Sequence, residues 1–164
     1  RLLNELLKNK FHVDTTIVDT SDLEAVKKVI RPNTKLVHIE TPGNPTLTIS
    51  DIRAIADIAH ENGALLSVDN TFASPYNQRP IELGADFTVE SLTKYINGHG
   101  DAMGGAIIGK KKYLDIIRAQ SQVNLGATIS RLTHGSSCVV QLPCPCGCGS
   151  TMPTHCRWQS TSRR

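Results

Sequence analysis

The chain has 164 residues, which suits one domain of ordinary size, and its hydrophobic fraction of 39% supports a core but is too low for a membrane protein. The net charge is +3, but residues 131–164 contain four arginines and none of the 15 acidic residues. Residues 1–130 are therefore slightly acidic, and their charge gives no support to nucleic-acid binding.

Strand-like and helix-like segments alternate along residues 1–130, with short loops between them. In chain order the sequence predicts a helix over 2–9, a strand over 11–19, a helix over 21–30, a strand over 35–41, a helix over 51–62, strands over 65–69, 87–89 and 104–108, and a helix over 110–123. This alternation is typical of an α/β domain with a mainly parallel sheet and flanking helices.

Two of the predicted helices have recognisable ends. Ser21, with Glu24 three residues later, has the pattern of a capping box at the start of the helix over 21–30. Gly63 fits the left-handed position that follows the helix over 51–62. The apolar residues of this second helix lie on one stripe: Ile52, Ile55, Ala56, Ile58 and Ala59.

Several polar residues follow directly after predicted strands. They are Asn44, Asp69 and the segment 91–94. Ligands of parallel α/β sheets bind beyond the carboxyl ends of the strands. We therefore expect these residues to lie at one rim of the sheet.

The segment from Ser91 to Asp101 carries the densest chemical signal, with Lys94 between hydroxyl side chains and a glycine-rich turn. A lysine that forms a Schiff base needs a site in which its amine becomes neutral. The hydroxyls of Ser91 and Thr93 can bind a phosphate without adding bulk. Taken alone, a lysine near Ser and Thr is more often a solvated surface lysine, and the longer pattern is what favours the chemical role.

Two further segments carry polar residues that match this chemistry. Asp69 ends a predicted strand 25 residues before Lys94, and a carboxylate beside a pyridine nitrogen keeps that nitrogen protonated. An acid in this position can also simply cap the next turn. Asn44 lies in the segment from Glu40 to Pro45, whose alternative interpretation is an ordinary turn between a strand and a helix.

In order and spacing, the segments 40–45, 67–75 and 91–101 resemble the Cys/Met-metabolism family of pyridoxal-phosphate enzymes. The resemblance extends over about residues 11–130. The family includes methionine γ-lyase, cystathionine γ-lyase and cystathionine γ-synthase. It implies the large domain of fold type I, a mainly parallel sheet between helices, so we expect residues 1–130 to be a partial cofactor-binding domain.

The resemblance implies a role for each matched residue. Lys94 would bind pyridoxal 5'-phosphate as a Schiff base and later move protons, and Asp69 would pair with the pyridine nitrogen. The other implied cofactor-binding residues are Ser91 and Thr93 at the phosphate, Asn44 near the phenolic oxygen and the substrate carboxylate, and Thr71 near the ring. No metal ligand is implied.

The implied function is that of a carbon–sulfur lyase of sulfur amino-acid metabolism. It would act on methionine or cystathionine by α,γ-elimination and give a 2-oxo acid, ammonia and a thiol. One alternative is a member that forms C–S bonds, such as cystathionine γ-synthase or an O-acetylhomoserine sulfhydrylase. The other is a non-catalytic α/β fragment that binds the cofactor weakly at most.

The family pattern also implies parts that this chain lacks. A phosphate-binding loop and a ring-stacking tyrosine would precede Arg1, and a small domain with an arginine for the substrate carboxylate would follow. We therefore expect a fragment that is inactive in isolation. The implied partner is a small sulfur amino acid, with neither nucleic acid nor a membrane, and the implied assembly is the homotetramer of the family.

Residues 131–164 depart from the family pattern. A reading frame shifted by one base lets residues 131–150 encode the Pro-Phe-Asn-Ala-Trp type of continuation that the family has. We therefore expect this segment to be a frameshifted tail, and a disordered one, because it lacks an apolar period.

The cysteines support the same division. Residues 1–137 contain none, which indicates a cytoplasmic protein without a disulfide framework. All five lie in the tail: Cys138, Cys144, Cys146, Cys148 and Cys156. A zinc or redox cluster is the alternative interpretation, but the Cys-x-Cys-x-Cys spacing differs from the usual two-residue spacing of zinc knuckles.

Overall fold

The computed structural model describes residues 7–122 and residue 124. Its helices are α1 (Asn9–Phe11), α2 (Leu23–Val29), α3 (Ile52–Glu61), α4 (Ser74–Asn77) and α5 (Lys111–Ile117). Its strands are β1 (Leu36–Glu40), β2 (Leu65–Asp69), β3 (Phe87–Ser91) and β4 (Gly105–Gly109). A 3₁₀ turn covers Pro80–Leu83, and wide helical turns cover Leu92–Ile96 and Arg118–Gln122.

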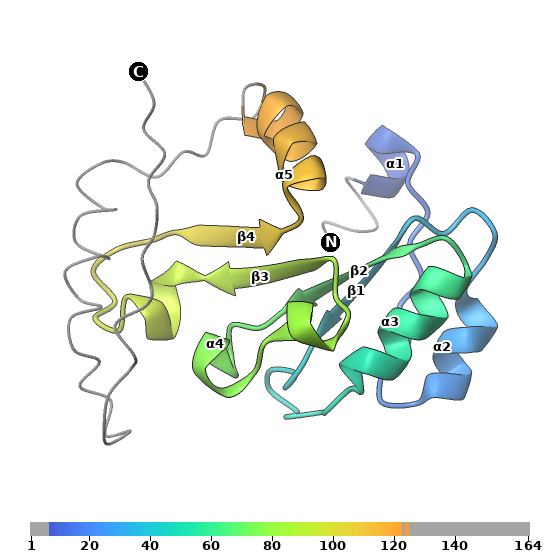
Figure 1. Ribbon diagram of the computed structural model, residues 1–164, viewed down its shortest axis with the longest axis horizontal. Coiled ribbons are helices and arrows are strands. Elements are labelled where there is room, and N and C mark those ends of the chain that lie inside the picture. Colours follow the sequence, from blue (N-terminus) through green and yellow to red (C-terminus); the bar gives the residue numbers. More distant parts are fainter. Residues whose placement is uncertain (1–6, 123, 125–164) are drawn as a thin grey trace.

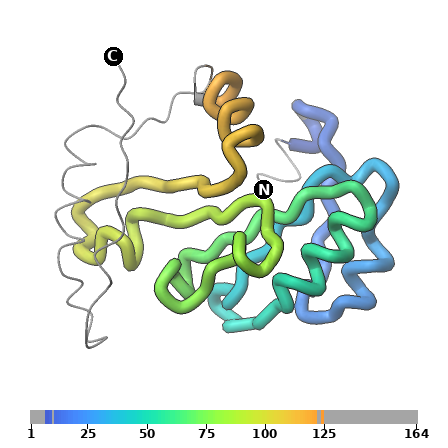
Figure 2. Tube along the Cα trace, viewed as in Figure 1, coloured from blue at the N-terminus to red at the C-terminus, as the bar shows by residue number. Residues whose placement is uncertain are grey.

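The four strands form one sheet in the order β1-β2-β3-β4. Strands β1, β2 and β3 run parallel to one another, whereas β4 is antiparallel to β3. Figure 1 shows this reversal, with α5 beyond β4 and with α2 and α3 next to each other beside β1 and β2. Figure 2 traces the chain from β3 through the turn at one end of the sheet and back along β4. The predicted α/β class and the mainly parallel sheet are confirmed.

The core lies between α3 and the sheet. Asp51 caps this helix, because its carboxylate accepts a hydrogen bond from the Ala54 N–H at 3.0 Å. The predicted apolar stripe is confirmed, since all five of its residues are buried. The central core cluster consists of Ile39, Ile52, Ile55, Ala56, Ala59, Ala64, Leu66, Val68 and Ala85.

Gly63 ends α3 in the way that its position predicts. Its φ of 70° lies in the left-handed region, which residues with a Cβ rarely adopt. Its N–H donates to the His60 carbonyl at 3.0 Å, and the next N–H, of Ala64, reaches the Ala59 carbonyl at 2.9 Å. These two bonds turn the chain directly into β2.

The strand predicted over residues 11–19 is wrong. Residues 12–19 form no strand, and α1 occupies Phe11 instead. Ile17 is 79% exposed, and Val13 donates its N–H to the Leu7 carbonyl at 3.0 Å rather than to a neighbouring strand. A β-branched sequence becomes a strand only where it finds a paired, half-buried position.

The capping box predicted at Ser21 is also wrong, by one residue. The N-cap of α2 is Asp22, whose carboxylate accepts from the N–H groups of Glu24 at 3.0 Å and Ala25 at 3.2 Å. The Ser21 hydroxyl donates to Asp19 at 2.7 Å instead. Asp is at least as good an N-cap as Ser, so the better-placed carboxylate takes the position.

Part of the sequence-based interpretation concerns residues that the structure does not describe. Residues 2–6 of the helix predicted over 2–9 are among them, and so is the whole segment 131–164, for which a frameshift, disorder and a possible cysteine cluster were considered from the sequence. Of the helices within the described residues, none has the length and apolar character needed to cross a membrane.

Candidate active site

The carboxyl ends of β1, β2 and β3 meet at one edge of the sheet because these strands are parallel. Glu40, the last residue of β1, lies opposite Asp69, the last residue of β2. Asp69 also lies opposite Val89, two residues before Ser91 at the end of β3. The rim that the sequence predicts is therefore present, and Asp69 and Ser91 stand at neighbouring strand ends.

Thr71 links the ends of β2 and β3. Its N–H donates to the Asp69 carboxylate at 3.0 Å, which fixes the direction of that partly buried side chain. Its hydroxyl oxygen accepts a hydrogen bond from the Ser91 N–H at 2.8 Å. A continuous chain of hydrogen bonds thus runs from Asp69 through Thr71 to Ser91.

Lys94 lies in the wide turn Leu92–Ile96 that follows β3. Its backbone departs from helical geometry, with φ −92° and ψ −121°, and its side chain is exposed. The neighbouring Thr93 is bound to the start of β4: its hydroxyl accepts from the Gly104 N–H at 3.0 Å and lies 3.3 Å from the Gly104 carbonyl. Tyr95 packs edge-to-face against Phe72, with ring centroids 6.3 Å apart, so the turn also contacts the loop after β2.

The segment after Lys94 is shaped by Asn97, whose side chain is fully buried. Its amide donates to the Asp101 carboxylate at 2.7 Å, and this hydrogen bond lowers the pKa of Asp101. The His99 ring nitrogen Nδ1 lies 3.0 Å from the Asn97 carbonyl oxygen. These contacts hold the shape of the loop rather than presenting groups for chemistry.

Asn44 lies apart from the other predicted site residues. It is exposed in the turn after β1, and its N–H donates to the Glu40 carboxylate at 3.2 Å. Within the described residues, no hydrogen bond joins it to Asp69, Ser91 or Lys94. The structure thus connects Asp69, Thr71 and Ser91 directly, places Thr93 and Lys94 on the next turn, and leaves Asn44 at the same rim without a bond to them.

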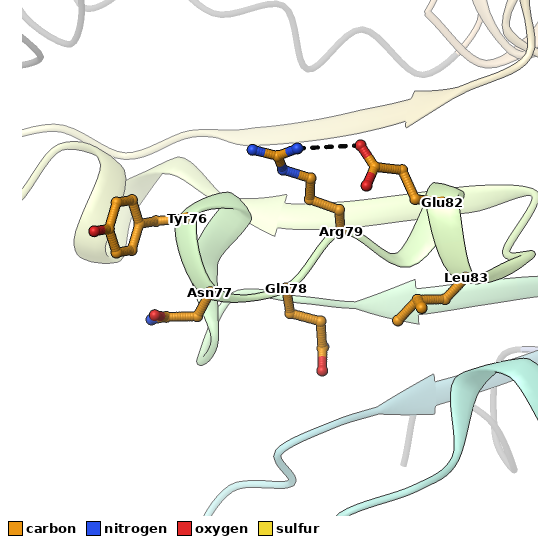
Figure 3. A pocket seen from close by; sticks show the side chains of 6 residues that line it. All are labelled: Tyr76, Asn77, Gln78, Arg79, Glu82 and Leu83. Atoms are coloured by element: carbon orange, nitrogen blue, oxygen red, sulfur yellow. Dashed lines mark hydrogen bonds and ion pairs between the residues drawn. The ribbon is translucent and has the colours of Figure 1, made fainter. Parts of the chain in front are cut away.

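Two cavities occur on the segment between β2 and β3, and neither is lined by Asp69, Ser91 or Lys94. One, of about 370 Å³, is lined by Tyr76, Asn77, Gln78, Arg79, Glu82 and Leu83. Figure 3 shows the ion pair between Arg79 and Glu82 of this cavity, which are 3.3 Å apart. The Gln78 side chain points away from this ion pair. The other, of about 310 Å³, reaches β3 at Thr88 and Glu90 and β4 at Ile108. The predicted cofactor residues lie outside both cavities: Lys94 is exposed, and Asp69 and Ser91 are partly buried.

Three polar residues beneath the rim were missed by the sequence analysis. Asn70 and Glu90 are buried, at 0% and 2% exposed, and Gln78 is half-buried. Burial raises the pKa of the Glu90 carboxyl, and the nearby charge of Asp69 raises it further, against the hydrogen bond from Asn70. The sequence signal was limited to adjacency: Asn70 directly follows Asp69 and Glu90 directly precedes Ser91, which places both near the rim but does not show that they contact each other.

The groups at this rim fit pyridoxal phosphate. The rim carries a carboxylate for a pyridine nitrogen, a primary amine for an aldehyde and two hydroxyls for a phosphate. No group of three His, Cys, Asp or Glu side chains in the described part of the chain is arranged to hold a metal ion.

Several known proteins named as γ-lyases are similar to this chain in sequence or in fold. The chain is 53% identical over 130 residues to a canavanine γ-lyase of Rhizobium leguminosarum bv. trifolii, a match that covers 79% of this chain and 32% of the relative. It is 50% identical over 112 residues to an L-methionine γ-lyase of Treponema denticola, covering 67% and 28%. The cystathionine γ-lyase of Lactobacillus plantarum, solved with L-serine, superposes with a TM-score of 0.79 at 40% identity, covering 84% of this chain and 36% of that one.

The chain therefore spans about a third of the length of the relatives that it matches. The model of one family, described as Cys/Met metabolism PLP-dependent enzyme, matches residues 1–135. This match agrees with the sequence motifs and with the parallel sheet and its polar rim. The chain belongs to the Cys/Met metabolism family of PLP-dependent enzymes.

Proposed function

We propose that this chain carries the cofactor-lysine portion of a PLP-dependent γ-lyase that acts on a sulfur amino acid, methionine or cystathionine. The observation that carries the proposal is the hydrogen-bonded series Asp69–Thr71–Ser91, which ends three residues before Lys94 in a chain of this family. The reaction is an α,γ-elimination that yields a 2-oxo acid, ammonia and a thiol.

In this proposal each residue at the rim has one task. Lys94 holds the cofactor through its Nζ and then accepts the proton that leaves the substrate Cα. Asp69 pairs with the pyridine nitrogen, and Thr71 supports it. The phosphate is bound by Ser91 and Thr93, and Asn44 binds near the phenolic oxygen and the substrate carboxylate. When bound, pyridoxal phosphate supplies an electron sink that makes the Cα proton acidic.

A second candidate substrate is canavanine, whose γ carbon carries an oxygen-linked guanidine group. The 53% identity to a canavanine γ-lyase favours it. Both candidates need the same proton transfer at Lys94 and differ only in the group that leaves the γ carbon. Members that form C–S bonds also share this first step, so they remain the alternative within the family.

The proposed activity is that of a whole family subunit, and this chain spans about a third of the length of such a relative. It includes a small amino acid as the partner, a homotetramer and a cytoplasmic location, as the family resemblance implies. The isolated chain is proposed to bind the cofactor weakly at most and to be inactive.

The test for the cofactor site is covalent labelling. The chain is mixed with pyridoxal phosphate, reduced with borohydride and analysed by peptide mass spectrometry. We expect one dominant adduct on Lys94 that Lys94→Ala removes and Lys28→Ala, a change of an exposed lysine on α2, leaves in place. An adduct spread over surface lysines and unaffected by Lys94→Ala would contradict the proposal for this chain.

The test for the reaction uses a protein that includes the whole family subunit. We expect it to form a 2-oxo acid from methionine, cystathionine or canavanine, and the fastest of the three identifies the leaving group. Activity found only with an activated homoserine ester and a thiol would refute the lyase assignment in favour of C–S bond formation.

A further inference from the structure

A network of buried side chains lies directly beneath the rim. The side-chain amide of Asn70 donates to the Glu90 carboxylate at 2.8 Å and to the backbone carbonyl of Gln78 at 3.0 Å. Its side-chain oxygen accepts from the Gln78 amide at 2.8 Å, and its backbone N–H donates to the Val89 carbonyl at 2.9 Å. Asn70 therefore uses both its backbone and its side chain to bind β3 and the segment after α4.

Gln78 extends this network to the first strand. Its side-chain amide also donates to the carbonyl of Thr41 at 2.8 Å, and Thr41 directly follows β1. One set of hydrogen bonds thus joins the ends of β1, β2 and β3. These are the strand ends that carry or precede Asn44, Asp69 and Ser91.

The network acts from the opposite side of the sheet to Asp69. The register pairs Val68 with Thr88 and Asp69 with Val89, so Glu90 shares a face with Thr88 and the core residue Val68. Glu90 therefore does not share a sheet face with Asp69 and Ser91. An influence of Glu90 on the positions of these two residues therefore passes through the backbone of the adjacent residues.

We propose that Glu90 is a positioning residue of the cofactor site: through Asn70 it holds the end of β2, with Asp69, against the end of β3, with Ser91. This inference rests on the proposed function. Its physical basis is the burial of both partners, because removing one of them leaves the other with an unsatisfied polar group out of water.

The charge state of Glu90 suits this task. Burial and the charge of Asp69 both raise the pKa of the Glu90 carboxyl, which favours its neutral form. A glutamine has the same shape as this carboxyl group, and its side-chain oxygen can accept the same hydrogen bond from Asn70. The conservative variant Glu90→Gln should therefore preserve the positioning, whereas Glu90→Ala should abolish it.

Thr88 provides a matched control on the same strand and face. It is 5% exposed, and within the described residues its hydroxyl has no hydrogen-bond partner. The change Thr88→Val keeps the shape of this side chain and removes no bond. It should leave the rim as it is.

The first measurement is amide hydrogen exchange in the full chain without cofactor. It is read at Ser91, whose N–H bonds across the rim to Thr71, and at Thr71, whose N–H bonds to the Asp69 carboxylate. We expect Glu90→Ala to speed both by about tenfold, and Glu90→Gln and Thr88→Val to change them little. Unchanged exchange in Glu90→Ala, or equal loss in Glu90→Gln, would overturn the inference. If Glu90→Ala lacks the far-ultraviolet circular dichroism of the parent, Glu90→Asp, which shortens the side chain by one methylene, replaces it under the same criteria.

The second measurement is the yield of the reduced pyridoxal-phosphate adduct on Lys94. Glu90→Ala should lower this yield about tenfold at a fixed cofactor concentration, and Glu90→Gln should restore it. A Lys94 adduct that forms equally in the parent and in Glu90→Ala would overturn the inference while leaving the proposed function intact. An absent adduct in the parent would count against the proposed function alone, and the exchange measurement would still decide the role of Glu90.

Discussion

The Ser91 N–H donates to the Thr71 hydroxyl oxygen at 2.8 Å, and Thr71 in turn donates its own N–H to Asp69 at 3.0 Å. Thr71 thereby joins the two strand ends of the candidate site, from positions that are 20 residues apart in the sequence. Its side chain acts as an acceptor toward one strand end while its backbone acts as a donor toward the other.

Replacing Thr71 by valine should weaken this connection. The change keeps the shape but removes the acceptor of a partly buried N–H, so we expect a loss of about 1–2 kcal/mol in the free energy of unfolding. Thr71→Ser keeps the hydroxyl and should lose much less. Urea unfolding of the two variants measures the difference, and equal stability of both would show that the bond contributes nothing.

Replacing Asp69 by asparagine should separate binding from catalysis. An amide has nearly the same shape but lacks the negative charge that stabilises a protonated pyridine nitrogen. In a protein with the whole family subunit we expect the rate of 2-oxo acid formation to fall on the order of a hundredfold, with the Lys94 adduct still formed. A rate close to that of the parent would exclude Asp69 from this role.

The buried Asp86 should make stability depend on pH in the acid range. Burial alone would raise its pKa, but the hydrogen bonds from His60 at 2.8 Å and from the Leu66 N–H at 3.0 Å, with the nearby charges of His60 and Lys110, bring it below its ordinary value of 3.8. A lowered pKa means that the stabilisation is complete above the unfolded value and is lost as the pH falls through the folded one. Unfolding free energies measured from pH 6 downward should therefore decline below about pH 4.

The matched variant for this prediction is Asp86→Asn. It cannot titrate, so its stability should be lower than that of the parent near neutral pH, and the two should converge in acid. A constant difference between parent and variant across the acid range would contradict the assignment of this effect to Asp86.

The free energy of unfolding should fall when a buried residue of α3 is truncated, and should change little when an exposed residue before α2 is truncated. Ile55 is fully buried in the central cluster, so Ile55→Ala should cost about 2–5 kcal/mol of unfolding free energy. Ile17 is 79% exposed, and Ile17→Ala should change stability by less than about 0.5 kcal/mol. Thermal unfolding followed by circular dichroism distinguishes the two, and a large effect at Ile17 would mean that this side chain is covered in solution.

The rim could be predicted from the sequence because its determinants are local. Asp69 and Ser91 each end a run of strand-forming residues, and parallel strands bring such ends to one edge whatever their detailed register. The helix stripe at Ile52 and Ile55 was predictable for the same reason, since its period is visible along the chain.

The support beneath the rim could not be predicted because it depends on register. Asn70 contacts Glu90 only since β2 and β3 align Asp69 with Val89, and a shift of one residue would put Glu90 on the other face. The failure at residues 11–19 has a related cause. Intrinsic strand preference at Ile17 does not specify a strand to pair with, and the exposed side chain shows that none covers it.

Thr93 binds Gly104 through its own N–H at 3.4 Å as well as through its hydroxyl. The ten residues between Thr93 and Gly104 therefore start and end at this pair of bonded residues. The same bonds connect the turn after β3 to the residue before β4. A replacement at Met103, which is 83% exposed, should therefore leave both strands in place. The lysine-bearing turn is thus anchored at its base by Thr93.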